Sequence, residues 1–97
     1  MRIIALERER RTVPAADYAP HLEPEARAIW KLAQAGIVRE IYFRDDRPQA
    51  VIMLEAPSID AARDVLSRLP LVQAGLIEFE VIGLRPYPGY ARLFASK

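Results

Sequence analysis

The 97-residue sequence has no cysteine, one histidine and four widely separated glycines. Without cysteine the chain has no disulfide, no iron–sulfur cluster and no zinc site built from thiolates. One histidine is too few for a metal site built mainly from imidazole ligands. Glycines at positions 36, 75, 83 and 89 do not form a glycine-rich phosphate loop. We therefore expect no metal and no cofactor.

An excess of one kind of charge is also absent. The 14 basic and 13 acidic side chains are mixed along the chain, whereas a nucleic-acid footprint needs clustered positive charge. No apolar run approaches the about 20 residues of a membrane span. The first residues, Met-Arg-Ile-Ile-Ala-Leu-Glu, become charged too soon for a secretory signal. We expect a cytoplasmic protein that binds neither nucleic acid nor membrane.

The sequence is rich in apolar residues. They make up 52% of the chain, which is generous for a single small domain with a modest interior. Part of this apolar surface is expected to lie between subunits.

Hydrophobic periodicity and turn residues divide the chain into short elements. Pro24 suits an early helical position because its missing N–H would be unpaired there, and Gly36 supplies the C-terminal stop. Ser58 is a candidate N-cap, and Pro70 ends the second helix. In chain order the expected elements are a strand at 2–9, a loop at 12–21, a helix from 24 to 34 or 35, strands at 37–44 and 50–55, a helix opening at 57–58, and a strand at 76–84.

This β-α-β-β-α-β order predicts an α+β fold of the ferredoxin-like type. It has a four-stranded antiparallel sheet with both helices on one face. We expect one domain at 1–84 and a C-terminal tail at 85–97.

The expected sheet is apolar on both sides. The strand at 76–84 carries Ile77 and Phe79 on one side, and Ile82 and Leu84 on the other. A face exposed to water would be polar. A second copy of the sheet is the simplest cover, so the sequence predicts a homodimer, or a multiple of dimers, built as a dimeric α/β barrel.

Glu25 is the most informative candidate for chemistry. On a helical wheel it falls within the apolar stripe of Leu22, Ile29 and Leu32. A core-facing carboxylate is costly unless it is paired or lines a cavity. Glu25 is therefore either a general base in a cleft or a first-turn carboxylate that bends outward.

Arg39, Tyr42 and Glu55 lie on the second and third expected strands, at 37–44 and 50–55. Arg39 could hold a substrate carboxylate with its planar fork of donors, or it could pair with Glu55 across the hairpin. The Tyr42 hydroxyl could donate to a developing oxyanion, or the ring could pack at the dimer interface.

His21 and Trp30 are further candidates for binding a small-molecule ligand. His21 precedes the expected helix, where a histidine is commonly exposed. Trp30 borders the apolar stripe, where a tryptophan most often belongs to the core.

Several segments of the sequence resemble muconolactone delta-isomerase. The Gly-x-x-Arg at 36–39 and the Leu-Pro-Leu at 69–71 are the most specific of them. The matching segments are 25–36, 36–39, 42–44, 56–71 and 77–84.

The resemblance implies a dimeric barrel within a larger oligomer and a cofactor-free shift of a double bond in an unsaturated lactone. Glu25 and Arg39 match family positions. The stretch before Leu22, the tail at 85–94 and the pocket residues Met53 and Glu55 depart from the family pattern. A relative with a different substrate is therefore expected.

The sequence leaves three functions open. The first is isomerisation of a small lactone or enol-type acid, in which Glu25, Arg39 and Tyr42 are catalytic, and His21, Trp30, Met53 and Glu55 contact the substrate. The second is a cofactor-independent monooxygenase of the same barrel superfamily. The third is a non-catalytic, oligomeric ligand-binding protein.

Overall fold

The structure is a computed structural model that describes residues 1–95. Its elements are β1 (Arg2–Glu9), α1 (Ala15–Gln34), β2 (Val38–Phe43), β3 (Ala50–Glu55), α2 (Ile59–Ser67), α3 (Pro70–Gln73), β4 (Ile77–Leu84) and the 3-10 helix η1 (Gly89–Leu93).

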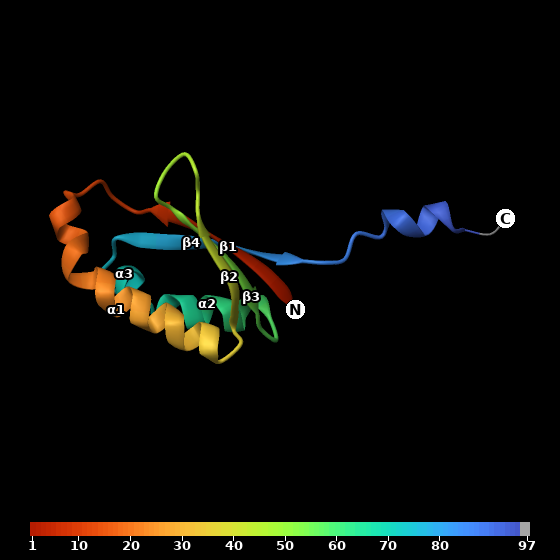
Figure 1. Cartoon of the computed structure of the whole chain (residues 1–97), viewed down its shortest axis with the longest axis horizontal. Helices are drawn as coiled ribbons and strands as arrows, with labels where there is room; N and C mark the ends of the chain where they lie inside the picture. The colour runs from red at the N-terminus through yellow and green to blue at the C-terminus, as the bar shows by residue number, and fades with distance from the viewer. Residues whose placement is uncertain (96–97) are drawn as a thin grey trace.

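The four strands form one antiparallel sheet in the order β2-β3-β1-β4. The helices α1, α2 and α3 all lie on the same side of this sheet (Figure 1). This arrangement confirms the expected ferredoxin-like α+β fold.

The main core lies between the sheet and α2. Alternate residues of the two central strands face the helices, and among them Ile3, Ile52 and Leu54 are almost completely buried. They pack with Leu66 of α2 and with Leu69, which lies between α2 and α3. The residues of α2 that face the sheet therefore form one side of the main core.

Helix α1 is longer than expected. A loop was predicted at 12–21, but the helix begins at Ala15 and continues through Pro20 and Pro24. Each proline lacks the N–H of a helical hydrogen bond and crowds the preceding turn, and the first turns of α1 stand at an angle to the rest (Figure 1). The prolines therefore bend the helix instead of delaying its start.

A bulge in β2 interrupts the alternation of side chains that a regular strand would have. Val38 pairs with Leu54 and Glu40 pairs with Met53, so Arg39 is an extra residue on the β2 side. An extra residue reverses which side chains face the helices beyond it. Val38 and the odd-numbered residues that follow the bulge thus share the helix-facing side.

The predicted N-cap of the second helix and the predicted glycine stop of the first are present in the structure. The Ser58 hydroxyl accepts a hydrogen bond from the Ala61 N–H at 3.1 Å. Gly36 and Gly75 adopt positive φ angles of 78° and 74°, which glycine tolerates best. Pro70 also begins the short helix α3.

The sheet face away from the helices carries apolar side chains in its centre. On this open sheet face, Ile4 lies opposite Met53 of β3 and Ile82 of β4. Ile82 and Leu84 are 39% and 37% exposed. The apolar and aromatic residues of the open sheet face are Ile4, Leu6, Tyr42, Val51, Met53, Ile82 and Leu84. Charged residues share the same face around them: Arg2, Arg8, Glu40, Glu55, Glu78 and Glu80.

Beyond β4 the chain leaves the body of the domain and ends in η1 (Figure 1). Tyr87 packs edge-on against Tyr90 with ring centroids 5.2 Å apart. Both tyrosines, together with Leu93 and Phe94, are 67–83% exposed. The sequence tail extends to Lys97, and positions 96 and 97 lie outside the described residues.

Within residues 1–95, no helix combines the length and apolar character needed to cross a membrane. In the same range, no group of three or more His, Asp or Glu side chains is arranged to hold a metal ion.

Candidate functional site

Helix α1 and the sheet enclose an apolar cleft of about 460 Å³, which we call the inner cleft. No residue of α1 is fully buried, so the helix does not close onto the strands as α2 does. The small side chains Ala26, Ala33 and Ala50 in its wall leave room that larger residues would fill. The remaining lining residues are Glu7, Leu22, Glu25, Ile29, Trp30, Ile41, Phe43, Ile52, Leu71 and Phe79.

Glu25 lies in the helix wall of this cleft and is half-buried. Its Oε1 accepts a hydrogen bond from the Leu71 N–H at 2.9 Å. That N–H belongs to the first turn of α3 and has no partner within its own helix. Burial raises the pKa of Glu25, and the Leu71 hydrogen bond and the nearby His21 oppose this rise.

Glu7 is a second carboxyl group in the inner cleft, and sequence reasoning missed it. It follows Ile3 and Ala5 at alternate positions of β1, so it faces the helices. Its Oε1 accepts from the Ala50 N–H at 3.1 Å. Burial raises the pKa of Glu7, the Ala50 hydrogen bond opposes this rise, and the negative charges of Glu25 and Glu9 add to it. The alternation of β1 was the signal that could have identified it.

An outer cleft of about 560 Å³ adjoins the inner one. Glu7 lines both, and so do Leu22, Phe43 and Leu71. The outer cleft adds polar groups, of which Tyr18 and Arg47 are the most useful for binding. The two clefts together therefore offer an apolar chamber with two carboxyl groups and a more polar chamber with a cation.

Large apolar side chains surround the entrance. Leu22, Trp30 and Phe43 are 54%, 64% and 69% exposed although they line the cavity. Such exposed apolar surface around a concave site is typical of ligand or subunit contacts.

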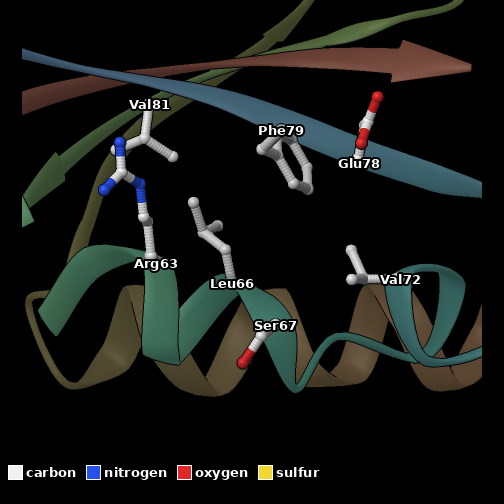
Figure 2. Close-up of a pocket in the computed structure, with 7 residues that line it drawn as sticks. All are labelled: Arg63, Leu66, Ser67, Val72, Glu78, Phe79 and Val81. Carbon is white, nitrogen blue, oxygen red and sulfur yellow. The ribbon is translucent and has the colours of Figure 1, made fainter. Parts of the chain in front are cut away.

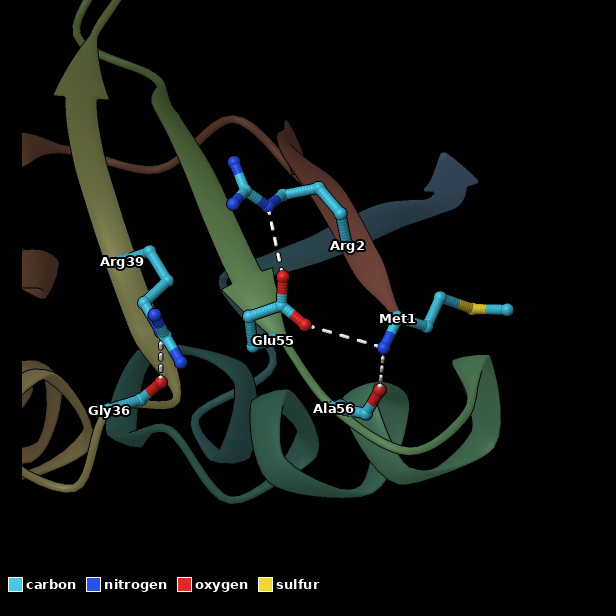
Figure 3. A network of polar contacts seen from close by, with 6 residues as sticks. All are labelled: Met1, Arg2, Gly36, Arg39, Glu55 and Ala56. Atoms are coloured by element: carbon cyan, nitrogen blue, oxygen red, sulfur yellow. Dashed lines mark hydrogen bonds and ion pairs between the residues drawn. The ribbon is translucent and has the colours of Figure 1, made fainter. Parts of the chain in front are cut away.

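The structure does not bring Arg39 or Glu55 to this cleft. Arg39 Nε donates to the Gly36 carbonyl at 2.6 Å. Glu55 instead contacts Arg2 Nε at 3.1 Å and the amino group of Met1 at 3.3 Å (Figure 3). The considered Arg39–Glu55 pair is therefore wrong, because Arg2 lies directly opposite Glu55 in the strand register.

Tyr42 and Met53 also lie away from the cleft, on the open sheet face. Tyr42 is opposite Val51, and its hydroxyl donates to Glu40 at 3.1 Å. This hydrogen bond raises the pKa of Tyr42. Tyr42 and Arg39 thus do not form a common site with Glu25, whereas Trp30 lines the cleft.

A smaller groove of about 180 Å³ lies between α2 and β4 (Figure 2). Phe79 points toward α2, but Glu78 points away from it, and the Ser67 hydroxyl points away from the sheet. Ser67 donates to the Asp64 carbonyl at 2.6 Å. These polar groups do not converge, so this groove is the weaker candidate.

The fold is similar to that of two solved enzymes. Muconolactone isomerase superposes with a TM-score of 0.75 at 22% identity, covering 91% of this chain and 92% of the other. A 5-chloro-2-hydroxyhydroquinone dehydrochlorinase from Burkholderia phenoliruptrix AC1100, solved with 2,5-dihydroxybenzoquinone, gives 0.66 at 15%, covering 86% and 93%. No family model matches the sequence, and no curated protein matches it. At these identities the likeness establishes the fold.

Proposed function

We propose that the chain catalyses a cofactor-free proton transfer on a small lactone or enol-type acid bound in the inner cleft. The observation that carries this proposal is Glu25, a half-buried carboxyl group with a raised pKa in a cavity whose other lining residues, apart from Glu7, are apolar. A carboxylate in such a place is a stronger base than one in water. The fold shared with muconolactone isomerase supports the same class of reaction.

The reaction conserves atoms and electrons. The Glu25 carboxylate takes a proton from the carbon next to the lactone carbonyl, and the C–H electrons form a carbon–carbon double bond. The carbonyl π electrons move to oxygen to give a dienolate. The electrons then return, and the Glu25 carboxylic acid delivers its proton to the distal carbon. The double bond has moved, and Glu25 is again a carboxylate.

Substrate orientation follows from the charges of the two clefts. The residues that line the inner cleft include no lysine, arginine or histidine, so the charged end of an acid would be poorly stabilised there. Arg47 in the outer cleft offers a cation, and its contact with Asp46 is long at 3.6 Å. In this proposal the carboxylate of an acid points to Arg47, which takes the role that the sequence suggested for Arg39.

The test is the isomerisation of α-angelica lactone, an uncharged unsaturated lactone, followed by proton NMR in deuterated water. Glu25→Gln keeps the acceptor for Leu71 but cannot take a proton. We expect kcat to fall by about 100-fold or more. The matched control is Glu23→Gln on the same helix, where the side chain is 82% exposed and pairs with Arg27.

Wild-type rates in Glu25→Gln, or equal losses in both variants, would contradict the role of Glu25. The rates with α-angelica lactone are then compared with those for muconolactone, which carries a carboxylate. This comparison tests whether the substrate carboxylate points to Arg47. Arg47→Gln is expected to raise KM for muconolactone and to leave α-angelica lactone unaffected.

A second candidate is the cofactor-independent monooxygenase that the sequence left open. The similar fold of a dehydrochlorinase named for a chlorinated hydroxyhydroquinone supports only the ligand class of this candidate, a hydroquinone-like compound. A cleft carboxylate could deprotonate a phenol and make it reactive toward oxygen. Oxygen consumption with hydroquinone, lost in Glu25→Gln, would favour this reaction over lactone isomerisation.

We also propose that the chain acts as a homo-oligomer in which two open sheet faces pack together and the tail contacts a neighbouring subunit. The apolar centre of the open sheet face and the exposed aromatic residues of η1 support this arrangement. A non-catalytic, ligand-binding oligomer would share these surfaces, but it would not depend on the Glu25 proton.

A further inference from the structure

We propose that Glu7 is the second catalytic group of the inner cleft: protonated, it donates a hydrogen bond to the carbonyl oxygen of the substrate whose carbon-bound proton Glu25 removes. This inference rests on the proposed function and deepens it, because it assigns an acid to a site that so far has only a base.

The two carboxyl groups belong to opposite walls of one cavity. Glu7 comes from the central strand β1 and Glu25 from α1, and both line the inner cleft. Each is held by a backbone N–H from a different element, Ala50 for Glu7 and Leu71 for Glu25. In both cases the bonded atom is Oε1. Among the described contacts none engages Oε2, so each group has an oxygen free for a ligand.

The charges around Glu7 favour its protonated form. On its own strand Glu9 follows at the next helix-facing position, and across the cleft stands Glu25, and both raise the pKa of Glu7. The polar groups that face it from elsewhere are Tyr18 and Arg47 in the outer cleft and the Ala50 N–H. His21 acts on Glu25. The charge of Glu25 thus disfavours ionisation of Glu7, and in this proposal Glu7 is the acid and Glu25 the base.

The step with Glu7 also balances. As Glu25 takes the carbon-bound proton, the carbonyl oxygen gains an electron pair and receives the Glu7 proton, which gives a neutral dienol and a Glu7 carboxylate. When the dienol collapses, Glu7 takes back the O–H proton and Glu25 delivers its proton to the distal carbon. Both groups return to their starting states.

Binding can be measured without turnover by using γ-phenyl-γ-butyrolactone, a saturated and uncharged analogue. Trp30 is the single tryptophan and lines the inner cleft, so its fluorescence reports occupancy. If Glu7 must be protonated, the wild-type dissociation constant rises about tenfold per pH unit above the pKa of Glu7. Glu7→Gln, which donates through its amide at any pH, should bind with no such dependence.

The pH dependence should persist in Glu25→Gln, shifted to lower pH because the Glu25 charge no longer raises the pKa of Glu7. It should be unchanged in the control Glu78→Gln, which changes a carboxyl on the neighbouring strand that does not line the cleft. The same pH dependence in Glu7→Gln as in wild type would overturn the inference.

Turnover separates this inference from the proposed function. We expect Glu7→Gln to lower kcat for α-angelica lactone about 100-fold and to remove the loss of activity at alkaline pH. If Glu25→Gln is inactive and Glu7→Gln keeps the wild-type rate and pH profile, the role of Glu7 is wrong and that of Glu25 stands. If Glu25→Gln keeps full activity, the proposed function is wrong, and the lactone titration still decides whether Glu7 contacts the carbonyl.

Discussion

At the scale of single residues, the site depends on two carboxyl groups that an apolar interior disfavours. Glu7 and Glu25 are each half-buried with one backbone donor. One hydrogen bond offsets only part of the cost of removing a charged group from water. Their burial therefore lowers the free energy of unfolding, as buried polar groups in active sites commonly do.

The burial of the two carboxyl groups predicts how the stability of the folded chain changes with pH. Because the folded-state pKa of both groups is raised, their protonated forms stabilise the folded chain, and this contribution to the free energy of unfolding is fully present below the ordinary glutamate pKa. It is lost as the pH rises through the raised values. The wild type should therefore have a lower free energy of unfolding at about pH 8 than at about pH 4, the ordinary glutamate value, and the difference should be smaller in Glu7→Gln and Glu25→Gln.

Urea unfolding of each variant at both pH values is the measurement, with Glu23→Gln as the exposed control. An equal pH dependence in the wild type and both cleft variants would show that the two carboxyl groups titrate alike in the folded and unfolded chain.

At the scale of elements, the sequence predicted the strands well and the first helix poorly. Strand β1 and strand β3 begin and end where alternation and turn residues indicated. Pro20 and Pro24 suggested a later helix start, but contacts of α1 with the rest of the fold outweigh the local penalty of the prolines. Such contacts between distant segments cannot be read from local sequence.

The bulge at Arg39 explains why the candidate site was only partly predicted. A regular strand would place Arg39 on the same side as Ile41, but the bulge makes Arg39 an extra residue, and its side chain bonds the Gly36 carbonyl and does not line the cleft. The helical wheel needs no register between strands, so it could indicate the side of α1 that Glu25 occupies. Glu7 could be found only by reading β1 as a strand with one face toward a cavity.

Gly36 offers a direct check of the turn between α1 and β2. Its φ of 78° is unfavourable for a side chain, while a Cβ added there would meet no atom within 4 Å. Gly36→Ala should therefore lower the unfolding free energy by about 1 kcal/mol through backbone strain alone. Gly36→Asn should lower it less, because asparagine tolerates this conformation. Equal losses in thermal unfolding would argue against strain as the cause.

At the scale of the whole molecule, two apolar surfaces remain uncovered by the described chain. They are the open sheet face and the tail with its exposed Tyr87, Tyr90 and Phe94. A single subunit has an extent of 62 × 29 × 20 Å, and the tail accounts for its elongation (Figure 1). Contacts between subunits would bury both surfaces.

Light scattering of two variants distinguishes these contacts. Met53→Lys places a charge in the centre of the open sheet face, so pairing of two sheets should be lost and the mass should fall to that of smaller species. Removal of residues 85–97 should leave the paired sheets intact and lower the mass only if the tail joins one pair to another. A wild-type protein that is monomeric at micromolar concentration would contradict both contacts.

The position of the ligand site is tested most directly by a crystal structure of the protein grown with γ-phenyl-γ-butyrolactone. We expect the lactone between α1 and the sheet, with its carbonyl oxygen within hydrogen-bond distance of Glu7 and its ring carbons facing Glu25. A lactone bound instead in the groove between α2 and β4, or on the open sheet face with the inner cleft empty, would contradict the assignment of the site.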